Sequence, residues 1–191
     1  MTGRLRFPIL AFFAVAVACC SILYELLLAQ TLATTMGNTT LRYNITIGLY
    51  IASMGVGALL YERLLSFFSK ERSEIIFFIK IECLLAVIGL CAPFLVLIFD
   101  SYFQQMGLAG KLDYQGFFTQ SSLFIFNHSL IVIIGILSGL ELPLLMALSA
   151  KIKENSETKV LMFDYLGTLV GAIIFPIVLV PHIHLFTMAG I

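Results

Sequence analysis

Three carboxylates interrupt stretches of sequence that are otherwise apolar enough to lie in lipid. Glu25 lies in SILYELLLAQ, Glu141 in LSGLELPLLMAL and Asp164 in VLMFDYLGTLVGAIIFPIVLVP. An ionisable side chain at the centre of a membrane helix costs at least about 2.5–3.5 kcal/mol, so such residues normally face a partner or a polar cavity. These carboxylates therefore predict either a cation site or a set of buried structural contacts.

A tyrosine stands beside two of these carboxylates, since Tyr24 precedes Glu25 and Tyr165 follows Asp164. A carboxylate beside an aromatic ring binds an ammonium group by charge and by cation–π attraction, so polyamines would suit such a pair. The alternative is structural: the acids are satisfied by Lys80 or by hydroxyl groups, and they only fix helix packing. Both interpretations stay open. The candidate ligand-binding residues are Tyr24, Glu25, Lys80, Glu82, Glu141, Asp164 and Tyr165.

The composition identifies the surroundings of these residues. Of the 191 residues, 60% are hydrophobic and only 12% are charged, and the formal net charge is zero. A soluble domain keeps roughly a quarter of its residues charged. We therefore predict an integral membrane protein whose main partner is the lipid bilayer, with no nucleic-acid partner.

Five apolar runs are long enough to cross roughly 30 Å of hydrocarbon, which takes about 20 residues. Each must be a helix, because lipid offers no hydrogen bonds to the backbone. The first run continues through Leu32, which favours an uncleaved helix over a cleavable signal peptide. The longest connector, residues 100–120, could carry a short interfacial helix. The predicted fold is an all-α transmembrane bundle in a single domain, residues 1–191, with helices at about 8–32, 44–60, 75–99, 122–148 and 160–181.

Basic residues are distributed unevenly over the connectors. If the N terminus is cytoplasmic, eight of them lie in cytoplasmic segments, only Arg42 and Lys111 lie outside, and Lys80 lies within the third helix. Cytoplasmic segments of membrane proteins are enriched in Lys and Arg, so we predict a cytoplasmic N terminus. The eight residues are Arg4, Arg6, Arg63, Lys70, Arg72, Lys151, Lys153 and Lys159.

The predicted topology sorts the charged residues by depth. At 1.5 Å per residue, Asp164 lies about 6 Å from the cytoplasmic end of its helix and Glu141 about 10 Å from the end of its own. Lys80 and Glu82 lie at a similar depth in the third helix. We expect these four to share one polar layer on the cytoplasmic side, whereas Glu25 lies toward the outer leaflet.

Two glycine pairs have the spacing of close helix packing. Gly167 and Gly171 lie near Asp164 on one helix face, and Gly135 and Gly139 form a second pair. Small residues four apart let two membrane helices approach closely. We predict that these four glycines are helix-packing residues and that Asp164 faces such a seam rather than lipid.

Pro143 follows Glu141 by two residues. A proline within a helix removes one backbone hydrogen bond and frees the carbonyl of the residue four positions before it, here Gly139. A carboxylate beside a local helix break would be similar to the broken-helix sites of transporters.

Three long blocks carry a resemblance to one family. They are YELLLAQTLATTMGNTTLRYNITIGLYIASMGVGALL, SGLELPLLMAL and FDYLGTLVGAIIFPIVLVP, which run from about Tyr24 to Pro181. In this order they resemble the transmembrane half of bacterial membrane-bound spermidine synthases, the polyamine aminopropyltransferases. The resemblance implies a multi-pass domain of the bacterial inner membrane. It also implies a following cytoplasmic Rossmann-like domain, which would transfer an aminopropyl group from decarboxylated S-adenosylmethionine to putrescine.

That catalytic domain is not expected within this chain. The sequence has no strand, glycine loop and helix in succession that could hold a nucleoside, since GVG at 55–57 lies inside an apolar run. The family's paired catalytic acids match no position here. The four cysteines lie within the apolar runs without paired metal-ligand spacing. We therefore expect no catalytic residue, no cofactor and no metal.

Three functions fit these observations. The chain could be the membrane anchor or assembly module of a spermidine-synthase-like protein, a polyamine or cation permease-like module that uses Glu141 and Asp164, or a structural subunit of a larger membrane complex. The glycine pairs favour packing with other membrane subunits or with a second copy. The apolar end HIHLFTMAGI leads us to expect either a longer parent chain or an interfacial segment.

Overall fold

The computed structural model describes residues 2–35, 39–68, 74–152 and 155–182. The side chains of residues 2–6, 39 and 65–68 lie outside that description. The apolar end 183–191, for which the sequence predicts a longer parent chain or an interfacial segment, lies outside it as well. The described residues contain helices and no strand. The helices are α1 (Thr2–Thr35), α2 (Thr39–Phe68), α3 (Glu74–Leu108), α4 (Phe117–Ile152), α5 (Glu157–Ile174) and the π-helix η1 (Phe175–Leu179).

The predicted all-α class is confirmed. Five helical segments of the described chain are long and apolar enough to cross a membrane: Phe7–Thr35, Thr40–Leu64, Glu74–Leu108, Phe117–Ile152 and Glu157–His182. Large apolar side chains remain exposed along all of them, for example Phe12, Leu59, Leu90, Ile125 and Ile177. A surface of this kind suits lipid, since a soluble protein exposes few large contiguous apolar patches. The cytoplasmic position of the N terminus stays a prediction.

The connector predicted at residues 100–120 is much shorter in the structure. Residues 100–108 continue α3 and residues 117–120 begin α4, so only residues 109–116 form the turn, with no separate interfacial helix. Gly110 adopts a positive φ of 68°, a conformation that glycine reaches without steric cost. The helices extend past their apolar cores because backbone hydrogen bonding continues wherever side chains permit it, whereas hydropathy marks only the lipid-embedded part.

The break predicted beside Glu141 does not form. Helix α4 runs without interruption from Phe117 to Ile152, with Pro143 inside it. Membrane helices tolerate proline because neighbouring groups and small local adjustments satisfy the backbone groups that it frees. Glu141 therefore lies on an intact helix rather than at a discontinuity.

The backbone does change at a different proline. Helix α5 passes at Phe175 into the π-helix η1, which includes Pro176. Phe175 still donates its N–H to the carbonyl of Gly171, but Val180 donates to the carbonyl of Phe175, five residues back. Pro176 has no N–H to continue the α-helical pattern, and a single wider turn is a common way to accommodate this loss.

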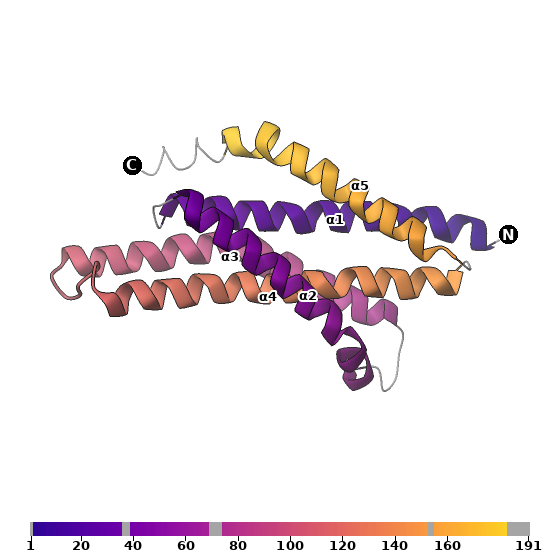
Figure 1. Ribbon diagram of the computed structural model, residues 1–191, viewed down its shortest axis with the longest axis horizontal. Coiled ribbons are helices and arrows are strands. Elements are labelled where there is room, and N and C mark those ends of the chain that lie inside the picture. Colours follow the sequence, from indigo (N-terminus) through magenta and orange to yellow (C-terminus); the bar gives the residue numbers. More distant parts are fainter. Residues whose placement is uncertain (1, 36–38, 69–73, 153–154, 183–191) are drawn as a thin grey trace. The chain divides into compact units, whose positions relative to one another are not determined.

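The chain divides into two compact units, and each is described by itself. Unit 1 comprises Met1–Leu26 and Glu141–Ile191. In it, α5 runs beside the first part of α1 (Figure 1). A Cβ added at Gly167 would meet the backbone of Val15, and one added at Gly171 would meet the side chain of Ile22 and, at 2.9 Å, the carbonyl of Cys19. The two helices approach so closely because these positions lack side chains.

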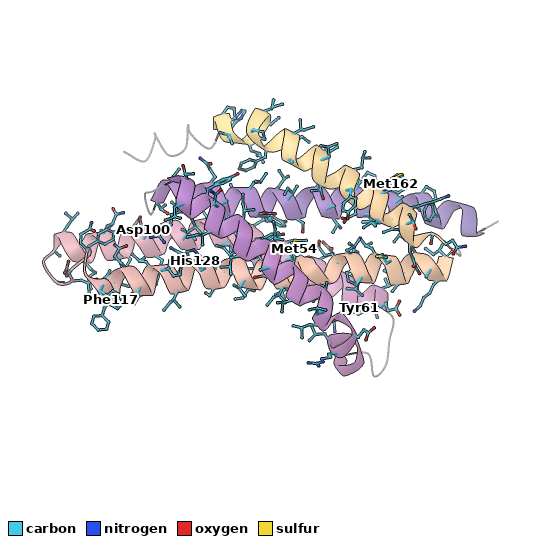
Figure 2. The ribbon with its side chains drawn as sticks, viewed as in Figure 1. Met54, Tyr61, Asp100, Phe117, His128 and Met162 are labelled. Carbon is cyan, nitrogen blue, oxygen red and sulfur yellow. The ribbon has the colours of Figure 1, made fainter. Side chains whose placement is uncertain are left out.

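Unit 2 comprises Leu27–Leu140. Helices α3 and α4 run antiparallel in it (Figure 1), and the ring of Phe99 stacks on that of Phe126 with centroids 4.0 Å apart. Helix α2 crosses α4 near Met54 (Figure 2), where a Cβ added at Gly139 would meet the Met54 backbone.

Contacts on either side of this crossing fix it in place. A Cβ added at Gly135 would lie 2.7 Å from Cβ of Ser53. Tyr50 is 1% exposed, and its hydroxyl donates a 2.9 Å hydrogen bond to the Ser138 hydroxyl. A polar contact between two buried groups sets the rotation of each helix about its axis.

Candidate functional site

Glu141 is one of the buried acids singled out in the sequence, and it has a defined partner in unit 1. Its side chain is 5% exposed, and its Oε2 accepts a 3.0 Å hydrogen bond from the hydroxyl of Ser21. Helix α1 supplies the donor and α4 the acceptor. A hydrogen bond to a buried carboxylate lowers the cost of keeping that group away from water.

Glu25 lies one helical turn beyond Ser21 on the same face of α1, because residues four apart are neighbours on a helix. Its side chain is 6% exposed, whereas Tyr24 is only half-buried. Two acids of unit 1 are therefore held away from solvent. The neighbouring tyrosine of Glu25 points to a different face, since successive residues lie about 100° apart.

Asp164 and Tyr165 have different surroundings although they are adjacent. Asp164 is half-buried, and its backbone carbonyl accepts a 3.1 Å hydrogen bond from the Thr168 hydroxyl. Tyr165 is 65% exposed. A ligand held between this carboxylate and this ring would have to reach from the partly buried side of α5 to its exposed side.

Lys80 and Glu82 belong to α3 in unit 2. Lys80 is exposed, and Glu82 is half-buried with a fully enclosed Oε1 atom. Two residues apart on a helix point about 200° away from each other. The common polar layer of Lys80, Glu82, Glu141 and Asp164 stays a prediction.

A polar cavity that the sequence had not indicated lies at the loop end of α3 and α4, where Asp100 is labelled in Figure 2. It has a volume of about 320 Å³. We call it the Asp100 pocket. Gln115 lies at its rim, and it is otherwise lined by Thr35, Asp100, Gln104, Tyr114, Gln120 and Leu123, all in unit 2.

Asp100 forms the floor of this pocket. It is only 4% exposed, and both of its carboxylate oxygens accept hydrogen bonds: Oδ1 from the Tyr114 hydroxyl at 2.9 Å and Oδ2 from Nε2 of Gln104 at 2.7 Å. Burial, followed by the hydrogen bond to Asp100 and its charge, raises the pKa of the Tyr114 phenol. Tyr114 therefore remains a hydroxyl donor at neutral pH.

The turn that carries Tyr114 is itself held by local hydrogen bonds. The hydroxyl of Thr119 donates to the backbone carbonyl of Asp113 at 2.8 Å, and Nε2 of Gln120 donates to the carbonyl of Tyr114 at 2.9 Å. The sequence carried one signal for this site, the four-residue spacing of Asp100 and Gln104, which places them on one helix face. Because Asp100 directly follows the predicted apolar run 75–99, hydropathy assigns it to the connector.

Comparison with known proteins finds relatives for most of the chain. A polyamine aminopropyltransferase of Leptospira interrogans is 32% identical over 175 residues, which cover 88% of this chain and 30% of that protein. Polyamine aminopropyltransferase 2 of Ralstonia nicotianae is 28% identical over 174 residues, covering 88% of this chain and 30% of the relative. Polyamine aminopropyltransferase 1 of Streptomyces coelicolor is 31% identical over 171 residues, which cover 86% of this chain and 27% of that relative.

No family model matches the chain, and no solved structure matches it significantly. The relationship to spermidine synthases that the three sequence blocks indicated is confirmed by these relatives. This chain is therefore homologous to a part of the polyamine aminopropyltransferases, and it spans about 30% of the length of the first of these relatives.

Proposed function

We propose that this chain is the membrane-spanning module of a polyamine aminopropyltransferase-like protein, acting as membrane anchor and assembly module without catalysing transfer itself. One observation carries the proposal. The matched residues make up 88% of this chain but only 30% of the Leptospira relative, and the described part of this chain contains five helices long and apolar enough to cross a membrane. The transfer reaction would then belong to residues of the parent protein that this sequence does not include.

The proposal places the chain in the bacterial inner membrane with its N terminus in the cytoplasm. The eight basic residues of the predicted cytoplasmic segments support this orientation. The exposed apolar faces of the helices offer surfaces to lipid, to other membrane subunits or to a second copy of the chain. Gly167 and Gly171 already pack against α1 within unit 1, so assembly with other subunits would use the exposed apolar faces instead.

A substitution on an exposed apolar face tests whether that face meets lipid. Leu90 on α3 is 62% exposed. In lipid, Leu90→Asp should sharply lower the yield of membrane-inserted protein, because an acid at the centre of a span costs about 2.5–3.5 kcal/mol. Leu90→Met is the matched control and should insert normally. The measurement is the protein retained in membranes after alkaline carbonate extraction, and equal retention of both variants would refute the anchor.

The absence of catalysis is tested separately. The purified chain, incubated with decarboxylated S-adenosylmethionine and putrescine, should form no spermidine. Formation of spermidine at a rate proportional to the protein concentration would refute this part of the proposal and leave the anchor role unaffected.

A second candidate function is a cation site, such as that of a permease-like module for polyamines. Its support is the pair of buried acids Glu25 and Glu141 in unit 1, with Asp164 half-buried in the same unit. Titration with spermidine should then show saturable binding that Asp164→Asn weakens about tenfold, equivalent to about 1.4 kcal/mol. Unchanged binding in the variant would exclude Asp164 from the site, and no saturable binding to the wild type would leave all three acids with a structural role.

A further inference from the structure

We propose that the Asp100 pocket binds the primary ammonium group of an alkylamine. The pocket lies wholly within unit 2 and shares no residue with the acids considered above. The proposal does not depend on the anchor role.

The pocket has a buried floor and an open rim. Asp100 and Leu123 are 4% and 1% exposed, respectively, whereas Gln104 and Gln115 are exposed. A ligand entering past the glutamine side chains would therefore meet a carboxylate at the bottom. A buried carboxylate excludes anions by repulsion and favours a positively charged group, most strongly where water is scarce.

The hydrogen bonds inside the pocket decide which kind of cation fits. The Tyr114 hydroxyl and the Gln104 amide donate to Asp100, and the Gln120 amide donates to a backbone carbonyl. The Thr35 hydroxyl donates to the carbonyl of Thr31 at 3.0 Å. These donors are thus directed to acceptors within the protein.

What remains for a ligand is a set of acceptors. They are the unused lone pairs of Asp100 and Thr35 and the amide oxygens of Gln104 and Gln120. The donors that remain are the second amide hydrogens of Gln104 and Gln120 and the side-chain amide of Gln115 at the rim. A primary ammonium group carries three N–H donors and no acceptor. It complements this set, because charge-assisted hydrogen bonds to a carboxylate are the strong ones.

The volume favours an organic cation over a bare ion. At about 320 Å³ the pocket is at the lower end of the range of roughly 300–1,000 Å³ that small-molecule sites occupy, and one water molecule takes only about 30 Å³. Within the part of the chain that the structure describes, no group of three or more His, Cys, Asp or Glu residues could hold a metal ion. An ammonium group that reaches Asp100 would leave its short alkyl chain toward the open rim, because the lining of the pocket is almost entirely polar.

The test is calorimetric titration of the full chain in lipid nanodiscs with four probes. n-Butylammonium carries the proposed group, n-butanol lacks the charge, tetramethylammonium carries charge without N–H donors, and potassium chloride supplies a bare ion. We expect saturable binding of n-butylammonium alone. Binding of tetramethylammonium or potassium with equal affinity, or no saturable binding of n-butylammonium, would overturn the proposal.

Two variants place the binding in this pocket. Asp100→Asn should weaken n-butylammonium binding about tenfold or more, since it removes the charge that assists the hydrogen bonds. Asp113→Asn is the matched control: Asp113 is exposed in the same turn and does not line the pocket, so binding should be unchanged. Equal affinity of wild type and Asp100→Asn would overturn the proposal.

A further variant covers the case in which Asp100→Asn fails to fold. Gln115 is exposed at the rim, so Gln115→Arg should fold normally and weaken binding by repelling the ammonium group from the entrance. Gln115→Leu, which adds no charge, is its control. Equal binding by these two folded variants would contradict the proposed site.

Discussion

The hydroxyl of Ser21 on α1 donates a 3.0 Å hydrogen bond to Oε2 of Glu141 on α4, 120 residues further along the chain. Both residues are more than nine-tenths buried. The carboxylate in LSGLELPLLMAL thus has a specific interhelical partner within unit 1. Its position is explained by helix packing before any ligand is considered.

This contact predicts a measurable coupling between the two residues. In a double-mutant cycle, Ser21→Ala and Glu141→Gln should couple by about 0.6–2 kcal/mol, the range found for polar contacts between membrane helices. Ser149 provides the control, because its hydroxyl donates to the carbonyl of Met146 on its own helix. Ser149→Ala and Glu141→Gln should be additive in reversible unfolding experiments. Additivity in both cycles would show that the Ser21 bond contributes nothing.

The close approach of α1 and α5 predicts that Gly167→Ala on α5 destabilises the protein, with Gly48→Ala on α2 as the control. Alanine favours a helix over glycine by about 1 kcal/mol. A Cβ at Gly48 meets nothing within 4 Å, so Gly48→Ala should be neutral or stabilising. A Cβ at Gly167 meets the Val15 backbone, so Gly167→Ala should destabilise the protein. Thermal unfolding in detergent would measure both, and equal melting temperatures would contradict the packing of α5 on α1.

Helix α2 contains two glycines, Gly55 and Gly57, that differ in how closely they are packed. A Cβ at Gly57 would meet the backbone carbonyl of Ile136 on α4, whereas one at Gly55 has open space around it. Gly57→Ala should therefore lower the yield of folded protein, and Gly55→Ala should not. Size-exclusion profiles of the two variants would compare these yields. A loss with Gly55→Ala alone would reverse the assignment of the packed face.

The orientation of the chain is tested by reporter fusions. Reporters placed after Ser66 and after Lys153 should both be cytoplasmic, and one placed after Lys111 should be external, because eight basic residues fall on the cytoplasmic side. An external reading at Ser66 or Lys153 would show that the topology is wrong.

The Tyr114 phenol provides a spectroscopic test of the pocket floor. Burial, then the hydrogen bond to Asp100 and the Asp100 charge, raise its pKa above the ordinary tyrosine value of 10.0. Subtracting the alkaline absorbance titration of Tyr114→Phe from that of the wild type isolates this phenol. Asp100→Asn should move its midpoint to lower pH, since the substitution removes the charge. A midpoint at the ordinary value in the wild type would show that the two groups are not in contact.

The sequence by itself determined the helices and their apolar character. Crossing a membrane demands about 20 consecutive apolar residues with internally bonded backbones, a local requirement that can be counted along the chain. It also indicated the family, through blocks that include Glu25, Glu141 and Asp164. The ends of the helices were harder to predict from the sequence, because α3 and α4 continue past their apolar cores into residues that hydropathy assigns to a loop.

Only the tertiary structure decided which polar residues meet. Ser21 and Glu141 are 120 positions apart, and no local pattern links them. Asp100 lies at the end of an apolar run, and it became the floor of a pocket because the short turn brings Tyr114 back onto it and α1 ends there at Thr35. Pro143 and Pro176 carry the same backbone constraint, yet α4 passes through the first unchanged while the helix containing the second widens to a π turn. The Ser21 and Asp100 contacts share one reason: a hydrogen bond between residues far apart in sequence depends on where two segments meet, and that meeting is set by the summed packing of many side chains. The structure gives no such reason for the different behaviour of the two prolines.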